Sequence, residues 1–168
     1  MTRLARLRVP LGFIFGALVW WLAAPTPASL MIGAPIAGVG EAIRIWAAGH
    51  LNKSREVTAS GPYRWFAHPL YVGSAVMGGG LAIASASAVA FLLVAIYLGM
   101  TITVAVAVEE AFLRRTFGDE YDRYRRGDTV SGSERRRFSF AQAMRNREYR
   151  AVIGFLVAVL LLALKSRA

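Results

Sequence analysis

The chain has 168 residues, of which 56% are hydrophobic, and it carries 20 Lys and Arg against 10 Asp and Glu. The absence of cysteine excludes disulfides, thiolate catalysis and cysteine-based metal sites, and two histidines are too few for a typical zinc site, so we expect no metal. The arginines flank apolar segments, where anionic headgroups and membrane topology account for them, so we expect no nucleic-acid partner.

Five apolar runs are each close to the length that a helix needs to cross a bilayer, about 20 residues. They predict an all-α, polytopic membrane protein with about five transmembrane helices and a single integral membrane domain over residues 1–168. The first run resembles a signal peptide, but the second begins almost at once, so we expect a retained first helix. The runs cover residues 9–25, 29–49, 69–86, 88–108 and 150–165.

The basic residues are distributed unevenly between the two sides of these runs. Most of them lie in the N-terminus, in the loop after the second run and between the fourth and fifth runs, whereas only Lys165 and Arg167 follow the fifth. The positive-inside rule therefore predicts a cytoplasmic N-terminus and an external C-terminus. We expect an inner (plasma) membrane of the bacterial type, with the working surface facing the cytoplasm.

The second and third runs contain residues that are unusual in a membrane helix. Glu41 and Arg44 are three apart within the second run, so we expect them to share a helix face and to neutralise each other. The triplet Gly78-Gly79-Gly80 in the third run follows no strand, which excludes a nucleotide-binding fingerprint. It indicates close helix packing or a bound lipid tail.

Residues 61–73, which lead into the third run, combine two prolines with polar aromatic side chains. The prolines predict irregular backbone before the helix begins, and such backbone near membrane depth must be buried or line a cavity. Taken alone, Tyr63, Trp65 and Tyr71 are better explained as an interfacial aromatic belt. His68 lies between the prolines, and we expect it to be functional.

Glu109 and Glu110 form a carboxylate pair where the fourth run ends. A charge at the membrane boundary costs free energy unless it meets cations or water, and the C-terminal end of a helix dipole disfavours an anion. Glu110 and Arg114 are spaced to pair along a helix, which accounts for one of the two glutamates. We expect at least one of them to be functional.

Four apolar and aromatic residues follow this pair at spacings of four, four and three. This spacing places them along one face of a helix, which is typical of a helix that lies at the membrane interface or covers a pocket. A helix that only anchors the chain would show the same pattern. The four are Leu113, Phe117, Tyr121 and Tyr124.

Together these residues resemble the isoprenylcysteine carboxyl methyltransferase and phospholipid methyltransferase family of membrane enzymes. The resemblance covers about residues 50–126, and the amphipathic segment and last helix in residues 127–168 lie outside it. Ala67 departs from the family pattern, which usually has arginine there, and Arg64 lies one helical turn earlier. The matching residues are Gly61, Pro62, Tyr63, His68, Pro69, Tyr71, Gly73, Glu109, Glu110, Leu113, Phe117, Gly118, Tyr121 and Tyr124.

The resemblance implies a methyltransferase that binds S-adenosylmethionine from the cytosol and takes a lipophilic acceptor from the surrounding membrane lipids. An isoprenylcysteine-like carboxylate, a phospholipid amine and a small thiol all remain open as acceptors. The implied catalytic residues are His68, Glu109 and Glu110. An arginine among residues 123–126 would bind the cofactor carboxylate. The implied cofactor-binding residues are Tyr63, His68, Pro69, Leu70, Tyr71, Gly73, Glu109, Glu110, Tyr121, Arg123 and Tyr124.

Two other classes of protein remain as alternatives. Membrane sterol reductases share a related helical architecture, and the arginine-rich segment before the last run would suit the 2′-phosphate of NADPH. A non-catalytic membrane protein that retains the fold is the other alternative, and Ala67 is its main support. Binding of S-adenosylmethionine, of NADPH or of neither distinguishes the three.

Overall fold

The computed structural model describes residues 3–53, 55–128 and 136–167, with side chains from residue 14 onward. This part of the chain is all-α and contains no strand, which confirms the predicted class. Each of the five apolar runs lies on a helix. The helices are α1 (Arg3–Leu22), α2 (Pro27–His50), α3 (Pro69–Ala84), α4 (Ala88–Phe117), α5 (Asp119–Arg126), α6 (Phe140–Arg145) and α7 (Tyr149–Lys165), and a short 3₁₀ helix, η1, spans Gly61–Arg64.

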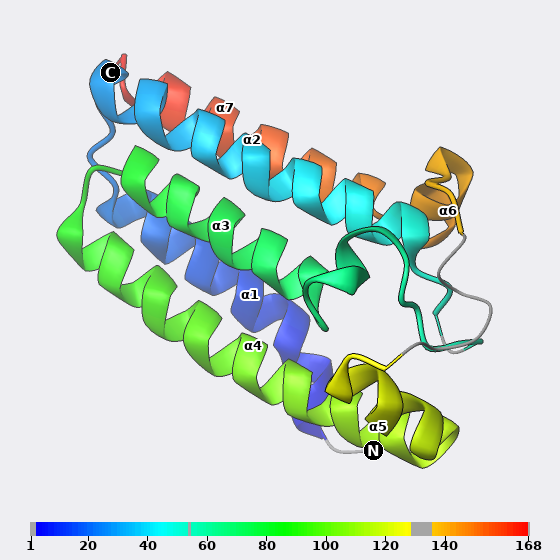
Figure 1. Ribbon diagram of the computed structural model, residues 1–168. Coiled ribbons are helices and arrows are strands. Elements are labelled where there is room, and N and C mark those ends of the chain that lie inside the picture. Colours follow the sequence, from blue (N-terminus) through cyan, green and yellow to red (C-terminus); the bar gives the residue numbers. More distant parts are fainter. Residues whose placement is uncertain (1–2, 54, 129–135, 168) are drawn as a thin grey trace.

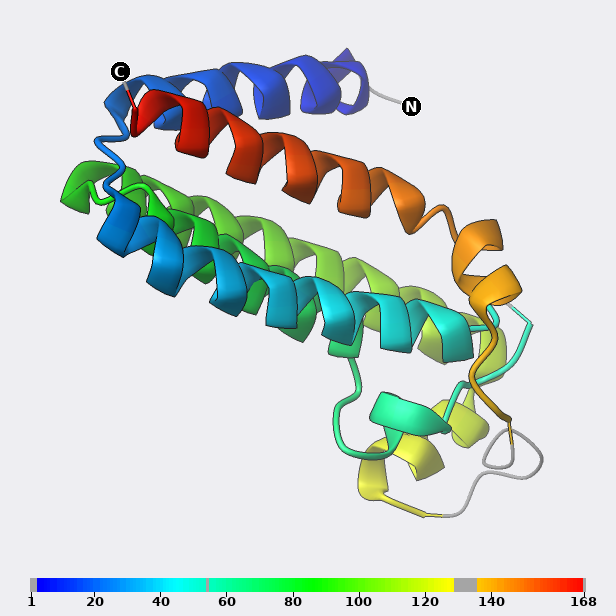
Figure 2. The same ribbon diagram turned by 90° about the horizontal axis from the view of Figure 1, so that it is seen from above.

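The five long helices lie side by side in two layers (Figures 1 and 2). One layer holds α2, α3 and α4, and α1 and α7 lie behind it. The start of α1 and the end of α7 lie at opposite ends of the bundle. The short helices η1, α5 and α6 gather at the end where α2 and α4 finish. At the other end, Ser87 caps the first turn of α4 by accepting a hydrogen bond from Ala90, which closes the tight α3–α4 hairpin.

Apolar side chains cover much of the outer surface of the bundle. Within the described residues, α2 and α4 are long and apolar enough to cross a membrane, and α3 is apolar but shorter. On α4, Val89, Leu92 and Ile96 are 57%, 59% and 51% exposed. A soluble protein rarely exposes so long an apolar stripe, whereas a lipid-facing helix requires one. The full number of membrane crossings stays a prediction.

Helices α2 and α3 pack backbone to backbone through small residues. Gly33 and Gly40 on α2 meet Gly80 and Gly73 on α3, and at each of these four positions a methyl group would collide with the other helix. Small residues are what allow membrane helices to approach so closely. The expectation of close packing is therefore confirmed at Gly80, whereas Gly79 faces open space.

Arg44 joins three helices through buried polar contacts. Its guanidinium lies 2.7 Å from the Glu148 carboxylate at the start of α7, and it also donates to the hydroxyl of Ser74 on α3. The predicted pairing with Glu41 is present, at 3.6 Å, but it is the looser of the two. Glu148 was not anticipated because it is far away in the sequence.

The end of the fourth helix differs from the prediction in two ways. Helix α4 continues past Val108 to Phe117, so the glutamate pair lies about two turns before its end, and the expected conflict with the helix dipole is wrong. Gly118, with φ +49°, then breaks the chain direction before α5 begins. The expected single helical face is therefore divided between the end of α4 and the short helix α5, although Tyr121 still packs with Leu113, Phe117 and Tyr124.

Candidate functional site

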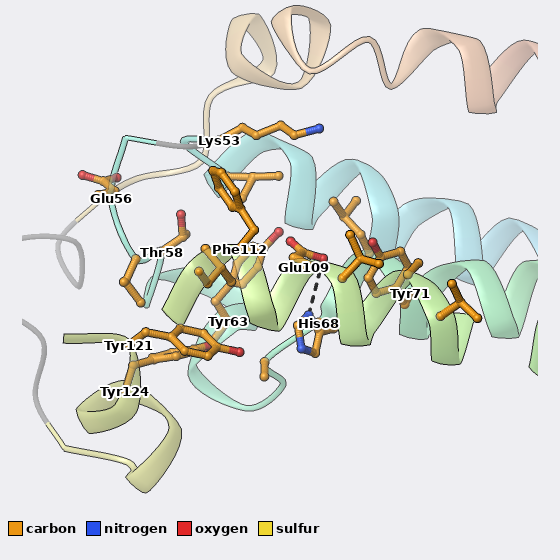
Figure 3. A pocket seen from close by; sticks show the side chains of 18 of the residues that line it. Lys53, Glu56, Thr58, Tyr63, His68, Tyr71, Glu109, Phe112, Tyr121 and Tyr124 are labelled. Atoms are coloured by element: carbon orange, nitrogen blue, oxygen red, sulfur yellow. Dashed lines mark hydrogen bonds and ion pairs between the residues drawn. The ribbon is translucent and has the colours of Figure 1, made fainter. Parts of the chain in front are cut away.

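A cavity of about 780 Å³ opens where α3, α4 and α5 meet the loop after α2 (Figure 3). Its volume lies within the range of small-molecule sites, roughly 300–1,000 Å³. One end carries the ionisable side chains of Lys53, Glu56, His68 and Glu109, and the other is an apolar wall of α4. The cavity therefore offers one polar and one apolar compartment.

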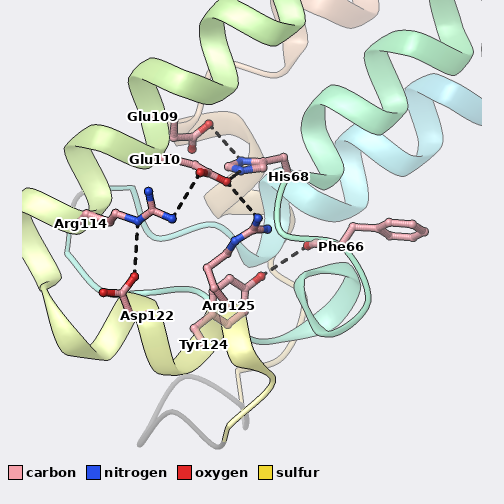
Figure 4. Close-up of polar contacts among 8 residues, drawn as sticks. All are labelled: Phe66, His68, Glu109, Glu110, Arg114, Asp122, Tyr124 and Arg125. Atoms are coloured by element: carbon pink, nitrogen blue, oxygen red, sulfur yellow. Dashed lines mark hydrogen bonds and ion pairs between the residues drawn. The ribbon is translucent and has the colours of Figure 1, made fainter.

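His68 is held in place by the backbone at the start of α3. It is the residue before Pro69, a position from which helical conformation is disfavoured, and it adopts φ −133° and ψ 61°. Its imidazole lies between two carboxylates, with Nδ1 3.6 Å from Glu109 and Nε2 3.3 Å from Glu110 (Figure 4). These two neighbours, Glu109 foremost, raise the pKa of His68 above its ordinary value although burial acts against them.

The two glutamates face different surroundings, because consecutive residues of a helix point about 100° apart. Glu109 lines the cavity. Glu110 turns toward α5, where its carboxylate lies 3.3 Å from Arg125 and 3.8 Å from Arg114 of its own helix (Figure 4). Glu109 is thus the carboxylate that a bound molecule can reach, whereas Glu110 ties α5 to His68.

Four tyrosines surround the polar compartment. Tyr63, Tyr71, Tyr121 and Tyr124 all line it, and the hydroxyl of Tyr124 donates to the backbone carbonyl of Tyr63 at 2.7 Å. Burial raises the pKa of Tyr121, and it raises the pKa of Tyr124 to about 12, so both are neutral hydroxyl groups at physiological pH. The Tyr121 side chain is 1% exposed, and its hydroxyl finds no partner among the described residues.

The structure brings seven of the predicted site residues to the cavity and leaves four outside it. Pro69 is buried in the first turn of α3, Gly73 lies in the contact with α2, Glu110 faces α5, and Arg123 is exposed on α5. Trp65 is 68% exposed, in keeping with an interfacial belt. The seven are Tyr63, His68, Leu70, Tyr71, Glu109, Tyr121 and Tyr124.

Several lining residues were not predicted from the sequence. On α4 a signal was present, because steps of four back from Glu109 lead to Ala105 and Thr101 on the same helix face. The lining residues of the loop after α2 follow no regular spacing from which they could have been predicted. The additional residues are Leu51, Lys53, Glu56, Val57, Thr58, Ala67, Met100, Thr101, Val104, Ala105, Val108 and Phe112.

Lys53 is the one Lys or Arg among the described residues that line the cavity. The arginines expected to hold a cofactor carboxylate lie differently: Arg125 is paired with Glu110, and Arg126 with Asp128 at 3.3 Å. Glu56 is paired with Arg136 at 2.7 Å, so its charge is balanced from outside the cavity. The charges left for a ligand are Lys53 and the His68–Glu109 pair.

A family model described as phospholipid methyltransferase matches residues 13–120 of the chain. The match takes in His68, both glutamates and the apolar wall of α4, and it ends just before Tyr121. No curated protein and no solved structure shows a significant match.

Proposed function

Because the chain belongs to the phospholipid methyltransferase family, as its sequence pattern predicted, we propose that it is a membrane enzyme that moves a methyl group from S-adenosylmethionine to a lipophilic acceptor. One observation carries this proposal. One cavity joins a polar compartment to the apolar wall of α4, and the polar compartment holds Glu109 and the Tyr121 hydroxyl, for which the described residues supply no partner.

The residues of the polar compartment fit a cofactor that is both a zwitterion and a sulfonium. Glu109 and the tyrosine rings favour a cation, the rings because a cation is attracted to their faces. Lys53 can hold a carboxylate, and the buried Tyr121 hydroxyl needs a partner that the described residues do not supply. S-adenosylmethionine, when bound, supplies an electrophilic methyl group. The protein contributes alignment of the reactants and exclusion of water.

The apolar compartment supports an acceptor drawn from the bilayer. Thr101 and Ala105 line it beside Met100, Val104 and Val108, whose side chains remain largely exposed although they line the cavity, so this stretch of α4 is accessible from outside the protein. An acceptor with a long apolar chain would therefore reach the cavity from lipid, and its reacting group would lie toward Glu109. If that group is an amine, it must lose a proton, which the Glu109 carboxylate is placed to accept.

We further propose that the cavity faces the cytoplasm of an inner (plasma) membrane crossed five times. The short helices at the cavity end carry Arg64, Arg123, Arg125, Arg126 and Arg145, whereas Lys165 and Arg167 are the basic residues at the far end. The positive-inside rule supports this orientation.

Calorimetry with S-adenosylhomocysteine on the purified, detergent-solubilised protein tests the proposal. We expect saturable binding by the wild type, and Tyr121→Phe should weaken it about tenfold, the effect of one hydrogen bond of about 1–1.5 kcal/mol. Because no described residue bonds this hydroxyl in the free protein, Tyr121→Phe should not lower the melting temperature of that state. Glu109→Gln should also weaken binding.

Tyr97→Phe is the matched control, since Tyr97 stacks on Phe15 of α1 and does not line the cavity. It should bind S-adenosylhomocysteine as the wild type does. A folded wild type that binds no S-adenosylhomocysteine would contradict the proposal, and NADPH would be the next ligand to measure.

A further inference from the structure

Residues 136–148, which lie beyond the family match, bond to the open end of α2. The last carbonyl groups of a helix have no partner within it. The side-chain amide of Asn146 donates to the carbonyl oxygens of Ala48 at 2.8 Å and Leu51 at 2.9 Å. Gln142 donates to the same Leu51 oxygen, also at 2.9 Å. A segment about 90 residues further along the chain therefore completes the end of α2, as Figure 2 shows for α6.

The start of this segment adds contacts on both sides of the same end. The ring of Phe138 packs against Gly49, where a methyl group would collide with it, and against the imidazole of His50, with ring centres 6.2 Å apart. Arg136 reaches past α2 to the carboxylate of Glu56, at 2.7 Å. The segment thus holds the last turn of α2 and a residue in the middle of the following loop.

That loop, residues 51–58, contributes Leu51, Lys53, Glu56, Val57 and Thr58 to the wall of the polar compartment (Figure 3). It brings Lys53 to the cavity and packs Val57 against Tyr121. Within the described residues the hydrogen bonds inside the loop are few: the Asn52 amide donates to the Thr58 hydroxyl at 3.3 Å, and the Arg55 amide donates to the Asn52 carbonyl oxygen at 3.2 Å. The position of this wall therefore depends on what holds its ends.

We propose that residues 136–148 are a positioning element of the cavity: by bonding the end of α2 and Glu56, they fix loop 51–58 where it meets the cofactor. The inference rests on the proposed function for the identity of the cofactor, S-adenosylmethionine. The placement of the loop itself can be measured without any ligand. Since the hydrogen bonds and the ion pair of the segment described above run to the end of α2 and to the loop, its loss should affect the polar compartment first.

The test compares Arg136→Gln and Gln142→Met with Arg137→Gln and Arg145→Gln, which alter exposed side chains of the same segment. Hydrogen exchange of residues 51–58 and the Kd for S-adenosylhomocysteine are measured on the full-length protein in detergent. The double variant that combines Arg136→Gln with Gln142→Met should show faster exchange in the loop and a Kd raised about tenfold, or about 1.4 kcal/mol. Both controls should stay within about twofold of the wild type.

Arg136→Lys should restore most of the affinity, since it retains a cation for Glu56. Faster loop exchange with an unchanged Kd would overturn the inference, because the segment would then be a structural brace only. Unchanged loop exchange would overturn it too, whether or not the protein binds S-adenosylhomocysteine. A wild type that binds none would count against the proposed function alone, while the exchange comparison would still decide the positioning.

Discussion

His68 holds one carboxylate at each ring nitrogen, and its charge state should be visible in the stability of the protein. Glu109 and Glu110 raise its pKa above the ordinary 6.5. A group whose pKa rises on folding stabilises the folded state fully below its unfolded pKa, and that contribution is lost as the pH rises through the folded pKa. We expect the melting temperature of the ligand-free protein to fall as the pH rises above about 6.5.

The comparison of His68→Gln with wild type isolates this effect. The variant should melt at a lower temperature in mild acid, and its melting temperature should depend less on pH above neutrality. His50→Gln, at the other histidine, is the control and should retain the wild-type fall. Parallel pH profiles for wild type and His68→Gln would show that the imidazole gains nothing from the two glutamates.

At the scale of the element, the α2–α3 pair offers a sharp test of packing. A methyl group on Gly80 would lie 2.7 Å from the Gly33 carbonyl oxygen and 2.8 Å from the Cα of Ala37. Both are backbone atoms, which cannot move aside as a flexible side chain can. Gly80→Ala should therefore destabilise the protein by about 1–3 kcal/mol. Its melting temperature should fall by several degrees, because 1 kcal/mol shifts a chain of this length by about 2–4 °C.

The neighbouring glycine provides the control for this change. Nothing lies near a methyl group at Gly79, so Gly79→Ala should be neutral or stabilising by up to about 1 kcal/mol, as alanine suits a helix better than glycine. Equal effects of the two substitutions would mean that helix propensity, and not the contact between α2 and α3, sets the response.

The elements also show which parts of the site a sequence can reveal. His68 and Glu109 could be predicted because each is placed by its local backbone, one before a proline and one on a helix face. Loop 51–58 could not, because its position depends on contacts such as Gln142 to Leu51, which join residues 91 apart and follow no period. The break at Gly118 was missed because side-chain spacing continues across it.

At the scale of the whole molecule, exposed apolar side chains lie along the middle of the bundle, and an exposed tryptophan lies near each end. Trp21, near the end of α1, is 71% exposed, and Trp65, beside the cavity at the opposite end, is 68% exposed. Tryptophan favours both membrane interfaces, so the pair indicates the two boundaries of the hydrocarbon layer.

Helix α3, with 16 residues, extends only about 24 Å, whereas the hydrocarbon layer is about 30 Å thick. Local thinning of the bilayer would accommodate the difference.

The proposed five crossings would place the α5 end of the bundle and the residues after α7 on opposite sides of the membrane, and the absence of cysteine makes this simple to measure. Arg167, after α7, and Arg123, on α5, are both exposed. A single cysteine at Arg167→Cys should react with a membrane-impermeant maleimide in intact cells, whereas Arg123→Cys should react only after permeabilisation. The positive-inside rule predicts this because the basic residues gather at the α5 end. Labelling of both variants from outside, or of neither, would mean that α7 does not cross the membrane. Labelling of Arg123→Cys in intact cells would in addition contradict the cytoplasmic location of the cavity.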